Sequence, residues 1–331
     1  MRQSTTIFIH TAKSVFATFL LGMAGLLASS CASGPGSAGA TIVADTAAQK
    51  PASSAKRNPR MFWTVQSAQG GGTAYIQGTL HLGSDELYPL DAEVLSRLKS
   101  ADLVLGELSS ADIDRSSTLI LERMSYALLD RSRTLTDILS KDEAAFLEEF
   151  LGKDVLRTIA LFHPWVAYTY LDAIAAGKSG LSAEKGVDMA LYAAAAEYGK
   201  AVGGLETLEK QLDVLTGPPL ATQLLVLKDA IREYRENPRA IEELYRAYLQ
   251  DDRKALARIV GESIERTERY SAELSSFNDS LLGKRNAVWA DRIASLLREG
   301  QTVFVFAGAA HFTGEGNVLD LLADRGFKVK P

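Results

Sequence analysis

Four short, mostly apolar segments each lead into a histidine or a glutamate, three of them directly and the last after Gly308-Ala-Ala, and long helical patterns separate them. The segments are residues 73–80, 102–106, 200–205 and 302–307, and the side chains that follow are His81, Glu107, Glu206 and His311. Buried strands that alternate with helices predict an α/β fold with a mostly parallel or mixed sheet. Ligands of such sheets bind beyond the carboxyl ends of the strands, so the four polar side chains mark a candidate site.

The rest of the folded part is mostly helical. Residues 62–80 read as a hairpin around Gly70-Gly-Gly72, and residues 90–100 have helical spacing. Residues 113–176 predict a series of amphipathic helices with a core stripe that includes Trp165. Residues 209–298 predict a long helical stretch, broken near 217–219, 237–238 and 283. We expect one domain over residues 61–331, with a central mixed, mostly parallel sheet and a large helical insertion.

The first 30 residues have the pattern of a secretory signal. Arg2 and Lys13 precede an apolar run at residues 15–27, which is too short to span a bilayer of roughly 30 Å. The sequence Leu27-Ala-Ser-Ser-Cys31 resembles a bacterial lipobox, which implies cleavage before Cys31 and acylation of that residue. Residues 31–60 are rich in Ala, Ser, Gly and Pro and predict a flexible tether.

This pattern predicts that the protein is exported, and the acyl chains would anchor it to a membrane. We expect a lipoprotein that faces the periplasm, most simply from the outer membrane. The alternative is a plain secretory signal that leaves Cys31 unmodified. His10 is removed under either interpretation.

Composition limits the possible chemistry. The single cysteine excludes a disulfide framework and a Cys-rich zinc module. A net charge of −5 argues against nucleic-acid binding. The chain has only four histidines, so a site that needs imidazole has few candidates. His163 precedes Pro164 among apolar helices and is expected to be structural.

Two imidazoles and a carboxylate with an open position would form a divalent-metal site. In that scheme His81 and His311 are ligands and Glu107 is a ligand or a general base. Glu206 is a second carboxylate, which either serves the reaction or favours a helix start. Arg285 either holds a carboxylate or developing oxyanion, or makes an ordinary ion pair. Asp188 is expected to cap a helix or to pair.

The residues alone leave other interpretations open. Two neutral histidines can cap strand ends by hydrogen bonds, with no catalytic role. A His–Glu pair can activate water without a metal. Ser84 and Ser109 follow two of the strand ends, but neither lies in a G-x-S-x-G elbow. The Gly314-Glu-Gly-Asn317 segment is an anion cradle or a turn, and residues 237–269 are solvated helices or a lid.

An ordered set of motifs resembles the TraB/PrgY/GumN family and spans about residues 62–330. The motifs are Gly78-Thr-Leu-His81 with Gly83, Leu87-Tyr-Pro-Leu90, Glu107, Gly186-Val-Asp188, Gly204-Leu-Glu-Thr207 with Gln211, Arg285-Asn286, and Gly308-Ala-Ala-His311 with Gly314. The family is similar in fold to erythromycin esterases and to a haem-binding lipoprotein. It includes the Tiki proteins, described as metal-dependent proteases whose site uses two G-x-x-H motifs and an intervening Glu.

What the resemblance implies is a site built from His81, Glu107 and His311, with Arg285 as a further candidate. The expected cofactor is a divalent ion such as Mn²⁺, Co²⁺ or Zn²⁺. The leading hypothesis is a metal-dependent hydrolase of peptide or ester bonds in the cell envelope, acting on an unknown peptide or small molecule. The alternatives are a non-catalytic binder of haem, metal or peptide, and a metal-independent esterase.

Overall fold

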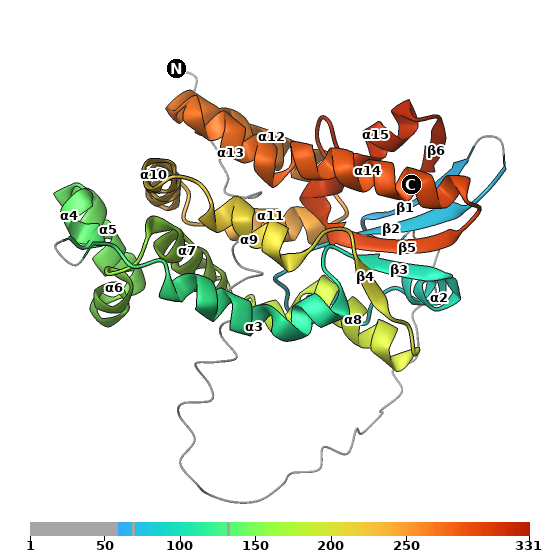
Figure 1. Cartoon of the computed structure of the whole chain (residues 1–331), viewed down its shortest axis with the longest axis horizontal. Helices are drawn as coiled ribbons and strands as arrows, with labels where there is room; N and C mark the ends of the chain where they lie inside the picture. The colour runs from blue at the N-terminus through green and yellow to red at the C-terminus, as the bar shows by residue number, and fades with distance from the viewer. Residues whose placement is uncertain (1–58, 68–69, 131–132) are drawn as a thin grey trace, which may run out of the picture.

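The computed structural model describes residues 59–67, 70–130 and 133–331 (Figure 1). The expected signal, Cys31 and residues 31–58 of the expected tether lie outside these residues. Within the described part, no helix combines the length and the apolar character needed to cross a membrane.

A six-stranded sheet forms the centre of the α/β half of the molecule, in the order β4-β3-β5-β2-β1-β6. Strands β4, β3, β5 and β2 are mutually parallel, whereas β1 runs antiparallel to both of its neighbours. The fold class is therefore the expected one: a mixed, mostly parallel sheet with many helices. The strands are β1 (Phe62–Ser67), β2 (Thr73–Thr79), β3 (Leu103–Gly106), β4 (Val202–Gly204), β5 (Thr302–Gly308) and β6 (Phe327–Lys330).

Strand β5 is central because it is apolar on both faces. Phe304 and Phe306 are almost fully buried, and so are the valines beside them. A strand that is buried on both faces lies inside a parallel sheet covered by helices. Its carboxyl end pairs Gly308 with Thr79 of β2, and β3 pairs Gly106 with Gly204 of β4. The carboxyl ends of four parallel strands thus meet at one edge of the sheet.

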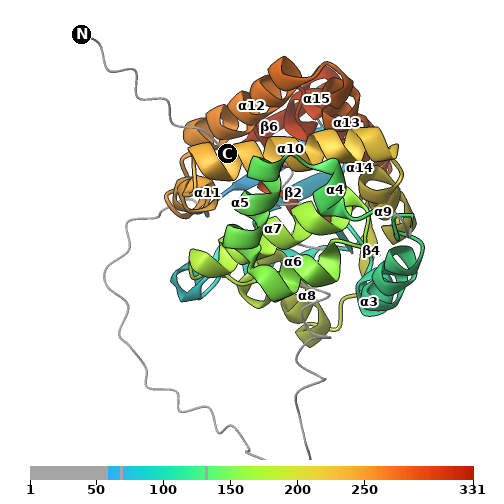
Figure 2. The same cartoon turned by 90° about the vertical axis from the view of Figure 1, so that its left-hand side faces the viewer.

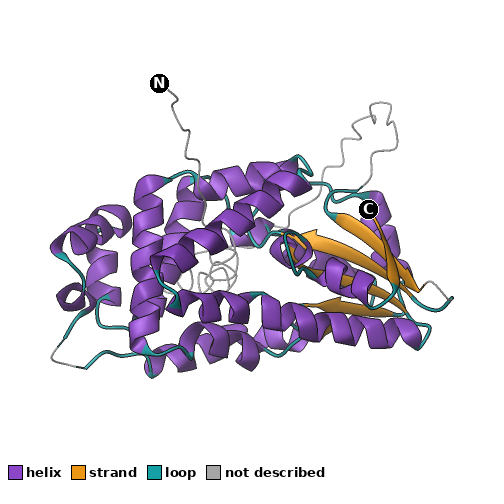
Figure 3. Ribbon diagram, turned by 90° about the horizontal axis from the view of Figure 1, so that it is seen from above, coloured by secondary structure: helices purple, strands orange, loops and turns teal. Residues whose placement is uncertain are grey.

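Helices cover both faces of the sheet and extend beyond it. Helix α14 packs against β1, β2 and β5, whereas α2 contacts β2 and α8 contacts β5 on the opposite face. A second, all-helical region lies at the far end of the molecule, where α4–α7 and α10 stack (Figures 2 and 3). The helices preceding β4 are α2 (Ala92–Ser100), α3 (Ser110–Ser125), α4 (Leu135–Ile138), α5 (Lys141–Leu151), α6 (Lys153–Ile159), α7 (Pro164–Lys178) and α8 (Val187–Glu197).

The stretch expected to be helical over residues 209–298 consists of six helices. Breaks occur at the expected Pro and Gly positions, and two further breaks fall near residues 251 and 271. Asp251 adopts a positive φ of 54°, and the Asp252 side chain caps the next helix by accepting from the Ala255 N–H. The helices are α9 (Leu208–Thr216), α10 (Leu220–Glu236), α11 (Ala240–Leu249), α12 (Arg253–Tyr270), α13 (Glu273–Leu281), α14 (Gly283–Arg298) and the later α15 (Val318–Asp324).

Candidate functional site

Three side chains converge above Gly308, at the end of β5. A methyl group on the Gly308 Cα would lie 3.2 Å from Glu107 Oε1 and 3.7 Å from His81 Nε2. The same point is 3.8 Å from His311 Cδ2. Each residue follows a different parallel strand, and His311 belongs to the short helix η4 (Ala309–Phe312). The glycine therefore leaves a small common space that the three side chains surround.

Glu107 is held as a carboxylate by donors on both of its oxygens. The Gly308 N–H donates to Oε1 at 2.7 Å, while Gln211 and Arg285 donate to Oε2 at 2.9 and 2.8 Å. Burial by itself would raise the pKa of Glu107, but the nearby Arg285 and the two histidines hold that pKa at about 2. The side chain is ionised at neutral pH, although it is almost completely buried.

His81 lies between two carboxylates. Asp188 Oδ2 is 3.2 Å from His81 Nδ1, and Glu107 Oε1 is 3.7 Å from its Nε2. Asp188 is placed by the start of α8, where the N–H of Val187 donates to Leu80 O. Burial lowers the pKa of His81, but Asp188 and Glu107 more than offset this effect, so the pKa lies above its ordinary value. Asp188, expected only to cap or pair, is the partner of a site histidine.

His311 has a defined tautomer. Asn286 Nδ2 donates to Gly316 O at 3.1 Å, so Asn286 Oδ1 is the acceptor for His311 Nδ1, 2.6 Å away. With its proton on Nδ1, the neutral ring keeps a lone pair on Nε2. Burial and the positive charge of Arg285 lower the pKa of His311 to about 3, so the ring is neutral at physiological pH.

Arg285 joins two buried carboxylates. Its Nε and Nη2 donate to Glu206 at 2.6–3.1 Å, and Nη2 also donates to Glu107. Its Nη1 donates to Leu281 O at 2.8 Å. Burial raises the pKa of Glu206 in spite of Arg285, and the charge of Glu107 adds to that effect. Arg285 thus makes ion pairs with two carboxylates of the protein itself, and its expected role toward a developing oxyanion stays a prediction.

The sequence matches the family model of the TraB/PrgY/gumN family over residues 61–331. The chain belongs to the TraB/PrgY/gumN family. The ordered motifs that indicated this membership include all three residues around Gly308. The TraB-family fold thus brings together side chains that lie up to 230 residues apart in the sequence.

Two curated relatives of this TraB-family chain cover most of its length, and a third covers less than half of it. An uncharacterized protein of Treponema pallidum (strain Nichols) is 28% identical over 80% of this chain and 81% of its own length. The uncharacterized protein YbaP of Escherichia coli (strain K12) is 29% identical over 75% of this chain and 87% of its own. The metalloprotease TIKI2 of Danio rerio is 27% identical over 44% of this chain and 32% of its own. No solved structure matches the chain.

Several other candidates have structural roles outside this cluster. Ser84 caps η2 (Asp85–Leu87) and contacts the Tyr245 hydroxyl at 2.8 Å, while Ser109 caps α3. His163 is half-buried at the N-cap of α7. Asn317 caps α15 by accepting from two backbone N–H groups, so the Gly314–Asn317 segment ends in an occupied helix cap. None of these residues contacts the cluster in the described part of the chain.

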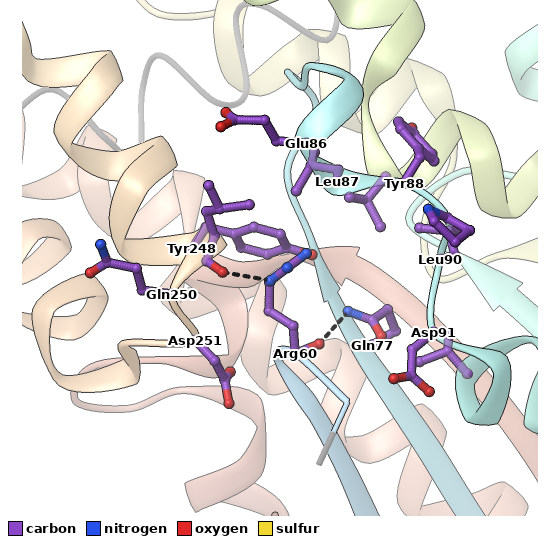
Figure 4. A pocket seen from close by; sticks show the side chains of 14 residues that line it. Arg60, Gln77, Glu86, Leu87, Tyr88, Leu90, Asp91, Tyr248, Gln250 and Asp251 are labelled. Atoms are coloured by element: carbon purple, nitrogen blue, oxygen red, sulfur yellow. Dashed lines mark hydrogen bonds between the residues drawn. The ribbon is translucent and has the colours of Figure 1, made fainter. Parts of the chain in front are cut away.

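Two large cavities lie near the cluster, in addition to a small apolar one of about 10 Å³ that His81 itself lines. One, of about 480 Å³, is lined by Gln77 of β2, by Val187, which precedes Asp188, and by Tyr248. Figure 4 shows Arg60 between Tyr248 and Gln77, with its Nε donating to Leu249 O at 3.0 Å. The other cavity, of about 530 Å³, lies between α12, α13, α14 and residues 310–316, and Asn286 forms part of its wall.

The donor types of the cluster suit a divalent cation. The Nδ1 atom of His81 faces Asp188, and the Nδ1 atom of His311 faces Asn286. Such partners orient the Nε2 of metal-binding histidines. Glu107 adds an ionised oxygen. Over residues 59–67, 70–130 and 133–331, no three His, Cys, Asp or Glu side chains already stand in a metal-binding arrangement. The predicted metal site therefore stays a prediction, with His81, His311 and Glu107 as its proposed ligands.

Proposed function

We propose that this protein is a metal-dependent hydrolase of the cell envelope that cleaves a peptide or ester bond above Gly308. The observation that carries the proposal is the convergence of His81, Glu107 and His311 to within 3.2–3.8 Å of one point above Gly308. A partial match to a metalloprotease supports the same class of reaction.

His81, His311 and Glu107 would hold a divalent ion, which supplies polarisation of a carbonyl and activation of water when bound. Asn286 keeps the lone pair of His311 on Nε2, and Asp188 orients the ring of His81. Arg285 keeps Glu107 ionised in a buried setting. Burial of the cluster excludes bulk water, which strengthens each of these charge interactions.

The charge of the cluster favours a hydrolase over a haem binder. A haem binder needs a flat apolar cleft beside a histidine, whereas the apolar cavity that His81 lines has a volume of only about 10 Å³. Their immediate neighbours include the charged pair Glu107 and Arg285. Polar groups placed around one small space suit a reaction on a polar bond.

The test uses the full-length chain and two histidine variants. We expect purified wild type to contain a stoichiometric divalent metal by elemental analysis and to hydrolyse members of a quenched fluorescent peptide library or of a p-nitrophenyl ester series. His81→Ala and His311→Ala are each expected to lose the metal and at least about 10²-fold in kcat/KM. His163→Ala is the matched control, because this histidine stands at the start of α7, outside the cluster, and its replacement should leave both properties unchanged.

Two results would overturn the proposal. One is wild-type protein that neither contains nor takes up Mn²⁺, Co²⁺ or Zn²⁺. The other is hydrolysis that survives in His81→Ala and His311→Ala at the wild-type rate.

A further inference from the structure

One turn of α14 directs three almost fully buried side chains toward the cluster. They are Arg285, Asn286 and Trp289. Residues three and four apart are neighbours on the surface of an α-helix, so Trp289 stands beside both of the others. Arg285 pairs with Glu107. Asn286 holds the His311 ring. The third residue of this turn is therefore placed to act on the same two site groups.

The Trp289 ring contacts the partners of both groups. Its centroid lies 4.3 Å from that of the His311 ring, and the two planes are inclined at 43°. The Arg285 Cζ lies 4.7 Å from the Trp289 ring centroid, which is within the range of a cation–π contact. Trp289 is only 1% exposed, so close packing holds the indole in place. The indole thus touches the imidazole of His311 and the guanidinium that holds Glu107.

The hydrogen bond from Asn286 does not by itself fix the plane of the His311 ring. Asn286 Oδ1 holds the ring at Nδ1 only. A hydrogen bond tolerates a range of angles, so the ring could tilt about that contact and move Nε2 on its far side. A site side chain keeps one direction when packing also locks its rotamer. Trp289 provides that packing contact.

The indole N–H takes no part in this support. Trp289 Nε1 is buried and has no hydrogen-bond partner in the part of the chain that the structure describes. A buried donor that lacks a partner is unfavourable, so the contribution of Trp289 comes from its aromatic surface. Phenylalanine at this position would keep an aromatic ring and would lose no hydrogen bond.

We propose that Trp289 is a positioning residue for His311 and Glu107. It holds the His311 ring by direct contact, and it holds Glu107 through Arg285. Its consequence for a metal ion rests on the proposed function, since the direction of His311 Nε2 affects metal binding only if these residues are ligands.

The metal-free protein tests the contact itself. The measurement is the NMR spectrum of the full-length chain with isotope-labelled histidine, in which His311→Ala assigns the His311 signals. We expect one sharp Cε1–H signal for His311 in the wild type and in Trp289→Phe. Trp289→Leu removes the aromatic surface, so that signal should broaden or double. A single sharp signal in Trp289→Leu would overturn the proposal.

Cobalt(II) binding measures the consequence for the site. We expect Trp289→Leu to bind Co²⁺ about 10–100-fold more weakly than wild type and with a changed visible absorption spectrum, because the ligands lose their support. Trp289→Phe should restore most of the affinity. Trp165→Leu is the matched control, since it removes a buried tryptophan from α7. It should lower the thermal stability as Trp289→Leu does and leave Co²⁺ binding unchanged.

The two measurements separate this inference from the proposed function. Wild type that takes up no Co²⁺ would reject the metal site, whereas a His311 signal that broadens only in Trp289→Leu would retain the positioning of the ring. If wild type binds Co²⁺, unchanged affinity and spectrum in Trp289→Leu would overturn the positioning role. Equal losses in Trp289→Phe and Trp289→Leu would also overturn it, because an aromatic ring would then provide no support.

Discussion

Asn286 Oδ1 lies 2.6 Å from His311 Nδ1 and fixes the proton of the imidazole on that nitrogen. Because Asn286 itself donates to Gly316 O, its orientation is set by the backbone of the loop before α15. The lone pair of His311 is therefore kept on the Nε2 side of the ring by a residue from α14. This pair links the wall of the 530 Å³ cavity to the cluster above Gly308.

Replacement of Asn286 by alanine should impair the site more than the fold. Loss of the acceptor leaves the buried His311 Nδ1–H unpaired, which costs about 1–3 kcal/mol and frees the ring to change tautomer. We expect metal affinity and kcat/KM to fall about 10–100-fold. Asn237→Ala, at the end of α10, is the control. Equal metal affinity in both variants would contradict the orienting role of Asn286.

Gly308→Ala should fill the common space with a methyl group. The backbone at Gly308, with φ of −51° and ψ of 131°, is allowed for alanine, so the effect comes from the side chain. We expect at least about 10²-fold loss of kcat/KM, with unfolding free energy changed by no more than about 1–3 kcal/mol. Gly177→Ala in α7, where the methyl meets nothing within 4 Å, is the control. Full activity of Gly308→Ala would show that the reaction occurs elsewhere.

Arg285→Met should destabilise the protein strongly, because Arg285 is the cation shared by two buried carboxylates. Glu107 and Glu206 would lose their charge partner, at a cost of about 3–5 kcal/mol in urea denaturation. Adding Glu206→Gln should restore part of that loss, since one buried charge is then removed. The exposed Arg292→Met serves as the control. A loss below 1 kcal/mol for Arg285→Met would mean that water or another cation replaces the guanidinium.

Cys31→Ser tests the proposed membrane anchor. Cys31 lies outside the described residues, so this prediction depends on the lipobox pattern alone. We expect the wild type in the membrane fraction and Cys31→Ser in the soluble periplasmic fraction, measured by fractionation and immunoblotting. Metabolic labelling with a palmitate analogue should mark only the wild type. If Cys31→Ser stays in the membrane fraction, the prediction of a lipid anchor at Cys31 is wrong.

Local sequence patterns were sufficient to predict the strands that lead to the site and the polar residues that follow them. The alternation of apolar runs with helices predicted the α/β class, and parallel strands bring their carboxyl ends to one edge. His81, Glu107 and His311 were therefore expected to meet, and the geometry above Gly308 places them together. Their chemical roles stay predictions. Proline and glycine likewise marked three helix breaks, because proline fixes φ and lacks a backbone donor, whereas the free backbone of glycine disfavours a helix.

Other features carried no local signal. The break at Asp251 depends on a positive φ, and the Asp251 Oδ1 accepts from the N–H of Met61, 190 residues away. Asp188 had been expected only to cap or pair, and its partner became identifiable once the start of α8 was placed beside Leu80, which follows β2. The 530 Å³ cavity depends on residues from three helices and a loop. Such groupings arise from helix packing, which no single segment specifies.

By itself, the sequence determined the fold class, the family and the identity of three converging side chains, because strand periodicity and residue type are local properties. Only the tertiary structure decided the charge state and orientation of those side chains. Asn286, Asp188 and Arg285 reach the cluster from helices α14 and α8, and burial makes their charges and hydrogen bonds effective. A pKa of about 2 for Glu107 and about 3 for His311 exists only when these elements are packed together.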